Sequence, residues 1–428
     1  MIERKRYLDQ LISHIDNQMI KVITGVRRSG KSFLLFNLFY HYLLSQGVPT
    51  DHIITLALDD MDYQDYRDPK KLYAFLKEKI RDPAEHYFVF LDEIQLAISK
   101  EELKQKDANV ALYGVLNGLL RRGNVDVYAT GSNSKLLATD VLTEFRGRGD
   151  EVRVLPLSFS EYFPAAQKAK EEAWQDYLLY GGMPQILSLK SDEQKVQYLN
   201  FLNREIYLRD IQERYDLKKL TGMEELMKVI ASSVGSLSNP QKISNTFKSA
   251  GNKGISAPTI AEYLTYLQDA CLISKAEQYD VKGRKYISTP SKYYYVDCGL
   301  RNALLGFRQF EETHLMENVI YNELLYRGYS VDVGVVPIRT NENDARIRQK
   351  LEIDFVANKG SKRYYVQSAF AIPDQEKMNQ EQKSLVQVGD SFRKIIVTGT
   401  NSPLWRNEQG ITIMSIFDFL LNENSLDM

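Results

Sequence analysis

Eight residues near the start of the chain have the pattern Gly-x-x-x-x-Gly-Lys-Ser, from Gly25 to Ser32, after the apolar run 20–23. In a phosphate-binding loop with this spacing, the glycines let the backbone approach the ligand and consecutive N–H groups face the phosphates. The lysine reaches the β- and γ-phosphates, and the serine hydroxyl ligates Mg²⁺. The pattern predicts that ATP and Mg²⁺ bind here, with Lys31 catalytic and Ser32 a metal ligand. The predicted nucleotide-binding residues are Gly25, Val26, Arg27, Arg28, Ser29, Gly30, Lys31, Ser32 and Phe33.

An acidic pair, Asp92 and Glu93, follows the apolar run 87–91. A strand buried on both faces reads as a continuous apolar run, and open α/β sheets bind ligands at the carboxyl ends of their strands. Asp92 is therefore predicted to hold Mg²⁺, and Glu93 to polarise the water that attacks the γ-phosphate. The alternative is a solvated turn after a buried strand.

Further candidates follow the predicted strand 125–130, whose end would lie next to the acidic pair. We expect Asn133, or failing that Ser132, to sense the γ-phosphate; the alternative is that Asn133 is a plain N-cap of the next helix. Two arginines that flank a glycine, Arg146 and Arg148, follow. Arg148 is the preferred arginine finger toward a neighbouring subunit, which would make the protein a homo-oligomer; the alternative is a solvated basic turn.

These residues need a parallel sheet with helices between its strands to bring them together. Apolar runs predict strands, and helical spacing of apolar residues predicts helices. The expected strands are 20–23, 52–58, 87–91, 125–130 and 151–155, and the expected helices are 2–17, 33–44, 69–80 and 108–122. The first part of the chain is thus expected to be an α/β domain with a P-loop NTPase sheet.

The composition is that of an ordinary globular protein, with 43% hydrophobic and 26% charged residues among 428. We expect no membrane partner, because no apolar stretch is long enough to cross a bilayer. Two cysteines, Cys271 and Cys298, cannot form a disulfide framework, and a cytoplasmic location is expected. The net charge of −1 gives no global basic field for nucleic acid, although a local patch is allowed.

The loop and acidic-pair motifs resemble one protein group, together with segments 130–137, 146–148, 156–162, 180–184, 297–302 and 352–355. It is the prokaryotic AAA-superfamily ATPases whose C-terminal half carries a domain of unknown function. The resemblance covers almost the whole chain. It implies a P-loop ATPase core with an additional strand and a catalytic glutamate, and it implies no particular cellular role.

Four domains are expected: an AAA-type core (1–163), a helical lid or connector (164–220), a winged-helix-like region (221–305) and a C-terminal α/β domain (306–428). The winged-helix-like region predicts DNA contact as one alternative, and protein interaction or a purely structural role as the other. The basic residues that would contact DNA phosphates are Lys248, Lys253, Lys282, Arg284 and Lys285.

The order of elements after residue 306 resembles the PD-(D/E)xK nuclease fold, with a loop at 339–350. Glu317 and Asp354 match its metal-binding acids, but Gln367 stands where the third acid is required and the following lysine is missing. Lys362 or Lys383 would have to replace that lysine from elsewhere. We therefore expect a degenerate, non-cleaving nuclease-like domain.

The predicted function is Mg²⁺-dependent ATP binding and hydrolysis, coupled to conformational change of C-terminal domains that bind nucleic acid or protein. One alternative is an ATP-dependent DNA-binding protein or nuclease. A second is a slow nucleotide-gated switch with a protein partner.

Overall fold

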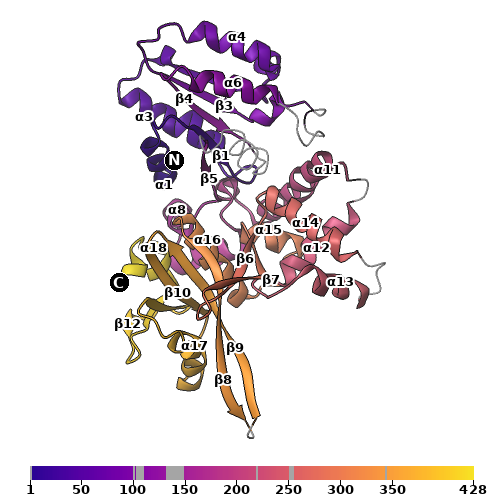
Figure 1. The fold of residues 1–428 in the computed structure, drawn as a ribbon, viewed down its shortest axis with the longest axis vertical. Coiled ribbons are helices and arrows are strands. Elements are labelled where there is room, and N and C mark those ends of the chain that lie inside the picture. The colour runs from indigo at the N-terminus through magenta and orange to yellow at the C-terminus, as the bar shows by residue number, and fades with distance from the viewer. Residues whose placement is uncertain are drawn as a thin grey trace. The chain divides into compact units, whose positions relative to one another are not determined.

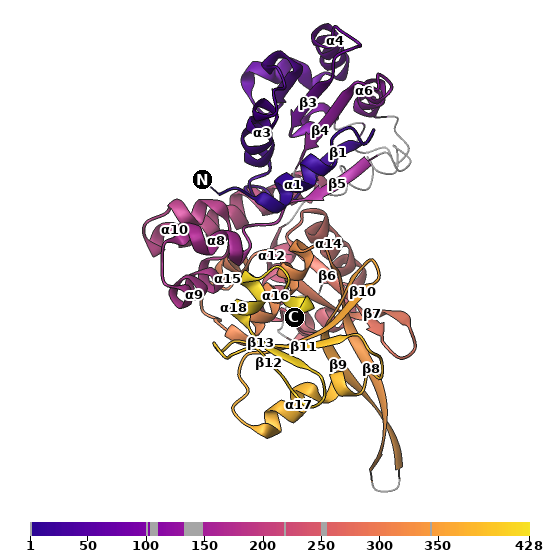
Figure 2. The same cartoon turned by 90° about the vertical axis from the view of Figure 1, so that its left-hand side faces the viewer.

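A computed structural model describes residues 2–99, 102, 110–131, 149–217, 220–249, 255–342 and 345–428. The chain divides into two compact units, and both are drawn in Figures 1 and 2. Unit 1 comprises Met1–Pro156 with Asp269–Cys271, and unit 2 comprises Leu157–Gln268 with Leu272–Met428.

Unit 1 is built on a five-stranded parallel sheet with the order β2-β3-β4-β1-β5. The strands are β1 (Ile20–Thr24), β2 (Ile53–Ala57), β3 (Tyr87–Asp92), β4 (Val125–Thr130) and β5 (Gly149–Arg153). Strands β1, β3 and β4 are buried along their whole length, which explains their largely apolar sequences. Strand β4 lies between the strand that leads into the glycine-rich loop and the strand that ends in the acidic pair. The predicted P-loop NTPase sheet is confirmed.

Helices cover both faces of this sheet (Figure 1). The helices of unit 1 are α1 (Lys5–Ser13), α2 (Lys31–Phe33), the π-helix η1 (Leu34–Phe39), α3 (Tyr40–Ser45), η2 (Thr50–His52), η3 (Met61–Arg67), α4 (Pro69–Lys79), η4 (Ile94–Ala97) and α6 (Ala111–Leu120). On one face, Leu72 of α4 and Leu116 of α6 share a core with the sheet. On the other, Phe39 of η1 packs with Phe90 and Tyr128, with ring centroids 5.6 and 4.8 Å away.

Unit 2 contains a mixed sheet with the order β12-β13-β11-β10-β9-β8-β6-β7 (Figure 2). The strands are β6 (Ile273–Asp280), β7 (Lys285–Tyr295), β8 (Ser330–Glu342), β9 (Ala345–Lys359), β10 (Lys362–Ala369), β11 (Arg393–Thr398), β12 (Trp405–Arg406) and β13 (Thr412–Ser415). Three neighbouring pairs, β6–β8, β10–β11 and β11–β13, are parallel, and the others are antiparallel.

The helices of unit 2 precede, interrupt and follow this sheet. They are α8 (Phe159–Ala166), α9 (Lys170–Tyr180), η6 (Pro184–Ser188), α10 (Asp192–Phe201), the π-helix η7 (Leu202–Leu208), α11 (Arg209–Tyr215), α12 (Thr221–Ser232), α13 (Pro240–Ser249), α14 (Ala257–Asp269), α15 (Cys298–Leu304), α16 (Glu312–Tyr326), α17 (Gln375–Val386), α18 (Ile416–Leu421) and η8 (Ser425–Asp427). No helix in the described part of the chain combines the length and apolar character needed to cross a membrane.

Helices α12, α13 and α14 are followed by the β6–β7 hairpin, so three helices and a hairpin occupy the region expected to resemble a winged helix. The hairpin is also the edge of the larger sheet, because β6 pairs with β8. Strands from the expected regions 221–305 and 306–428 therefore share one sheet.

The expected loop at 339–350 is wrong, because these positions lie largely within strands β8 and β9. The pairing of β6 with β8 extends along β8 as far as Val335. Beyond that residue, β8 and β9 form a two-stranded ribbon (Figure 1). A ribbon outside the body of a sheet has no buried face that would require alternating apolar residues. Its sequence therefore lacks the pattern by which strands are recognised.

Candidate functional site

The glycine-rich loop leaves β1 with three residues in the left-handed region of φ. They are Gly25 (φ 138°), Arg28 (φ 67°) and Gly30 (φ 96°). A Cβ atom on Gly25 would lie 2.2 Å from the carbonyl oxygen of Val154, so a side chain cannot be accommodated there. Both the backbone conformation and the close approach explain why glycine begins the loop.

Lys31 is buried within this loop. Its Nζ atom donates hydrogen bonds to the carbonyl oxygens of Gly25 and Val26 at 3.0 and 3.1 Å. Burial lowers the pKa of Lys31, and the negative charge of Glu93 opposes this shift. Phosphate oxygens that replaced these neutral carbonyls would form stronger, charge-assisted bonds with the ammonium group.

Asp92 ends strand β3 and accepts hydrogen bonds from the hydroxyl groups of Thr130 and Ser32. Burial raises the pKa of Asp92, and these two bonds act in the opposite direction. Carboxylate and hydroxyl oxygens are hard ligands of the kind Mg²⁺ prefers. Ser32 and Asp92 already contact each other, so the residues present fit one shared Mg²⁺ ion.

Glu93 has a left-handed backbone (φ 51°), and its carboxylate accepts a hydrogen bond from the side-chain amide of Gln95. Its backbone N–H donates to Oγ1 of Thr130 at 3.2 Å. Thr130 therefore contacts both members of the acidic pair. Thr130 is not among the site residues predicted from the sequence; the available signal is its position as the last residue of β4, where neighbouring parallel strands end together.

The other predicted residues of this site have different outcomes. Asn133 and Arg148 lie outside the described residues. Within the loop, Val26 and Ser29 are buried, whereas the side chain of Phe33, on the following helix, is 42% exposed. The loop therefore presents its backbone, rather than these side chains, as the surface available to phosphates.

Two segments that carry the family resemblance, 180–184 and 297–302, contact each other in unit 2. Asp297 accepts hydrogen bonds from the backbone N–H of Gly182 (2.7 Å) and of Leu300 (3.0 Å). Gly181 has φ 75°, and a Cβ atom on it would lie 2.1 Å from a carboxylate oxygen of Asp297. Asn302 donates from Nδ2 to two carbonyl oxygens at the end of α9, each at 2.9 Å.

We call Gly181, Gly182, Asp297 and Asn302 the glycine–aspartate clasp. Burial raises the pKa of Asp297 to about 6, although backbone N–H groups that donate to its carboxylate oppose the rise. The clasp joins the end of α9 to the start of α15 through hydrogen bonds of Asp297 and Asn302 to the backbone. It is a structural element of unit 2.

The predicted nuclease-like acids lie around a buried lysine that the sequence analysis did not select. Nζ of Lys292, on β7, is 2.8 Å from Glu317, 2.8 Å from Glu352 and 3.3 Å from Asp354. The hydroxyl group of Tyr294 also donates to Glu317 at 2.7 Å. Burial alone would lower the pKa of Lys292, but the three carboxylates raise it. These four charged residues, Lys292, Glu317, Glu352 and Asp354, form the Lys292 cluster.

Gln367 lies next to this cluster, and its Oε1 atom accepts a hydrogen bond from the backbone N–H of Asp354 at 3.4 Å. The second carboxylate oxygen of Asp354 accepts from the backbone N–H of Ser368 at 2.9 Å. Lys362, which was considered as a replacement lysine, instead forms an ion pair with Asp427 at 2.7 Å. In the described part of the chain, no three His, Cys, Asp or Glu side chains are grouped to hold a metal ion.

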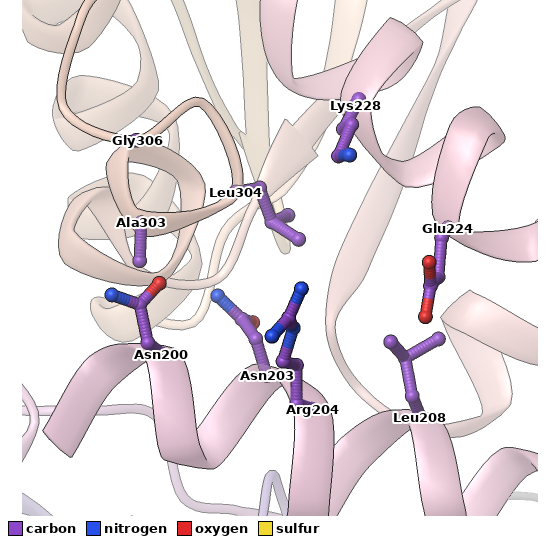
Figure 3. A pocket seen from close by; sticks show the side chains of 9 residues that line it. All are labelled: Asn200, Asn203, Arg204, Leu208, Glu224, Lys228, Ala303, Leu304 and Gly306. Atoms are coloured by element: carbon purple, nitrogen blue, oxygen red, sulfur yellow. The ribbon is translucent and has the colours of Figure 1, made fainter. Parts of the chain in front are cut away.

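A polar cavity of about 380 Å³ lies in unit 2 between η7, α12 and the end of α15 (Figure 3). Arg204, Lys228 and Glu224 line it, together with the side chains of asparagines and leucines. Arg209, on α11, forms an i,i+4 ion pair with Glu213 at 3.1 Å. The cavity carries charges of both signs and therefore selects no single ligand charge.

Comparisons with known proteins agree with the geometry of unit 1. Residues 17–163 match the family described as AAA domain, and residues 171–311 match a domain of unknown function (DUF8612). The strand order, the glycine-rich loop and the acidic pair together define the first part of the chain as an AAA-type P-loop ATPase domain.

The chain is 35% identical over 426 residues to an uncharacterized protein of Haemophilus influenzae, covering 98% of this chain and 99% of that protein. The chain therefore belongs to the same family as the Haemophilus influenzae protein. An uncharacterized protein of Methanocaldococcus jannaschii is 27% identical over 354 residues, covering 79% of this chain and 71% of that protein. A solved Walker-type ATPase of Pyrococcus abyssi is 16% identical, with a TM-score of 0.49, covering 71% of this chain and 96% of that one.

Proposed function

We propose that this protein binds and hydrolyses ATP with Mg²⁺, and that hydrolysis changes the conformation of unit 2, which binds nucleic acid or another protein. The observation that carries the proposal is the contact of Thr130 with both Asp92 and Glu93, with Ser32 bonded to Asp92. This arrangement supports Asp92 as a metal ligand and Glu93 as the candidate base of the proposed reaction.

Each residue has a distinct task in this proposal. Lys31 binds the β- and γ-phosphates, and Glu93 orients and polarises the attacking water. Ser32 and Asp92 would hold Mg²⁺, which supplies positive charge to the phosphoryl oxygens as charge develops on them. Thr130 fixes the relative positions of the two acids.

Two further roles are proposed from the sequence alone. Asn133 follows β4 and is assigned as the sensor of the γ-phosphate. Arg148 is assigned as an arginine finger that acts on a neighbouring subunit, which makes the active form a homo-oligomer. If Arg148 acts between subunits, mixing Arg148→Ala with Glu93→Gln protein should restore part of the ATPase activity that each lacks alone.

The catalytic assignment is tested with two variants. Lys31→Ala should lose ATP binding, and Glu93→Gln should retain binding but not hydrolyse ATP, measured by calorimetry and by phosphate release. Hydrolysis by purified Glu93→Gln at the parent rate would remove Glu93 as the catalytic base. Tight binding with negligible turnover by the parent would favour a slow nucleotide-gated switch.

For unit 2 we propose a nuclease-like fold that does not cut. The Lys292 cluster supports this, because an ammonium group contacts the three carboxylates that would otherwise attract a divalent cation. Plasmid DNA incubated with the protein and Mg²⁺ or Mn²⁺ should remain intact. Cleavage that disappears in Asp354→Ala would establish nuclease activity instead.

The partner of unit 2 is proposed to bind through α12–α14 and the exposed basic turn between β6 and β7. Lys282 and Arg284 lie in this turn and Lys285 begins β7, and all three are exposed. If the partner is DNA, retardation in a gel should weaken with salt and should weaken further when the three residues are replaced by glutamine. Lys190→Gln, an exposed lysine elsewhere in unit 2, is the matched control. No retardation at low salt would favour a protein partner.

A further inference from the structure

Arg4 precedes helix α1 and is 4% exposed, an unusual degree of burial for an arginine. Its guanidinium group lies over the ring of Tyr7, 4.8 Å from the centroid. Nη1 donates to the carbonyl oxygen of Ser29 at 3.1 Å, and Nη2 donates to that of Leu155 at 2.6 Å. One side chain thus connects the glycine-rich loop to the chain just beyond β5.

The bond to Ser29 determines how the loop presents its backbone. A trans peptide is planar, so its C=O and N–H groups point in opposite directions. Because Arg4 holds the carbonyl group of Ser29, the N–H group of Gly30 in the same peptide points away from Arg4. Gly30 is flexible, and without this bond the peptide could rotate and turn its carbonyl oxygen toward the phosphates, where it would repel them.

The bond to Leu155 fixes the other side of the loop. Leu155 directly follows Val154, whose carbonyl oxygen closely approaches Gly25. Arg4 therefore connects the C-terminal half of the loop to the segment that confines its first glycine. Its positive charge also lies behind the loop and favours an anionic ligand in front of it.

We propose that Arg4 is a positioning residue for polyphosphate binding, acting through the Ser29–Gly30 peptide. The inference rests on the proposed ATP binding and adds the N-terminal segment to the nucleotide site. Arg4 does not touch the nucleotide. It selects the loop conformation in which the backbone N–H groups face the β-phosphate.

A purely structural role would be to attach helix α1 to the rest of unit 1. Tyr7 provides the comparison, because its hydroxyl group accepts a hydrogen bond from the backbone N–H of Leu155 at 3.0 Å. Tyr7→Phe should weaken the attachment of α1 and leave the loop peptide in place. It is the matched control for Arg4→Met, which keeps a long side chain but no donors.

The test measures the dissociation constants of ATP, ADP and AMP, the kcat at saturating ATP, and the circular-dichroism melting curve of the full-length protein. Arg4→Met should weaken binding of ATP and ADP by about tenfold or more, because the charge-assisted hydrogen bond that holds the loop peptide is lost. AMP has no β-phosphate, so its affinity should change less. Tyr7→Phe should lower the melting temperature and leave ATP affinity within about twofold of the parent.

Arg4→Lys keeps a cation but cannot reach two carbonyl oxygens with a planar fork, so it should lie between the parent and Arg4→Met. It also keeps the proposal testable if Arg4→Met does not fold. Parent-like ATP and ADP affinity in either folded variant overturns the inference. A parent protein that binds no ATP, with Lys31→Ala no different, overturns the proposed function itself.

Discussion

Lys292→Met removes the ammonium group of the Lys292 cluster while keeping a side chain of similar length. Lys292 is 3% exposed, and the side chains of Glu317 and Asp354 are each 10% exposed, so the variant leaves two buried carboxylates without this counterion. Removing one partner of a buried ion pair costs about 3–5 kcal/mol of stability. Glu352 is 38% exposed and regains water, so it adds little to this loss.

The stability lost in Lys292→Met should depend on pH, and the pKa of Glu317 determines whether the loss grows or shrinks as pH rises. Burial raises the pKa of Glu317 to about 7, and Lys292 opposes the rise. Because the folded-state pKa exceeds the unfolded one, the stability due to the neutral carboxyl is complete below about pH 4.3 and is lost as pH rises through 7. Without Lys292 the pKa rises further, so the variant loses more stability between pH 6 and 8 than the parent does.

The chain offers a specific probe for this measurement. Both of its tryptophans, Trp174 and Trp405, belong to unit 2. Urea unfolding followed by tryptophan fluorescence therefore reports the unfolding of unit 2. We expect Lys292→Met to lower its free energy of unfolding by about 3–5 kcal/mol at pH 8 and by less at pH 6.

Two further variants test whether the stability lost in Lys292→Met comes from the buried carboxylates. Glu352→Gln removes the exposed carboxylate and should cost less than about 1 kcal/mol. Adding Glu317→Gln and Asp354→Asn to Lys292→Met removes the buried charges and should recover most of the lost stability. A Lys292→Met protein within about 1 kcal/mol of the parent at pH 8, with the parent's pH dependence, would refute the reasoning.

Three other predictions concern the glycine-rich loop, the acidic pair and the glycine–aspartate clasp. Gly25→Ala should lower ATP affinity by at least about tenfold in calorimetry, since its backbone strain alone is about 1–3 kcal/mol; unchanged affinity would contradict the close approach seen there. Thr130→Val should lower kcat by about 100-fold with ATP affinity unchanged, through misplacement of the acids; a parent-like kcat would remove Thr130 from the site. For Asp297, whose folded-state pKa of about 6 is raised, unit 2 should lose stability as pH rises from about 4 to 6. Asp297→Asn should flatten this slope in urea unfolding, and an unchanged slope would assign it to another group.

The parallel sheet of unit 1 could be predicted because its signals are local. A strand buried on both faces must be apolar along its length, and the glycine-rich loop and the acidic pair each occupy adjacent positions in the sequence. The helix expected over 33–44 is present, but it is divided by the π-helix η1. The pattern of apolar residues does not distinguish π from α geometry over so short a segment.

Residues whose roles depend on distant contacts could not be predicted. Lys292 lies in a run of polar and aromatic residues, and nothing nearby indicates that it meets Glu317 and Asp354, which are 25 and 62 positions away. Arg4 reads as part of a charged N-terminus, and its burial depends on a contact with Leu155, 151 positions away. Local patterns specify elements, whereas these contacts follow only from the arrangement of the sheet.

The glycine–aspartate clasp has a consequence for the order of events during synthesis. Gly182 and Asp297 are 115 positions apart, so at about 5–20 residues per second the ribosome adds Asp297 about 6–23 s after Gly182. All five strands of unit 1 have been made by Arg153, well before that time. The five-stranded sheet of unit 1 can therefore form on the nascent chain before Asp297 is present to accept the hydrogen bond from Gly182. Premature termination between the two positions would release a chain with all five strands of unit 1 present and unit 2 unable to close.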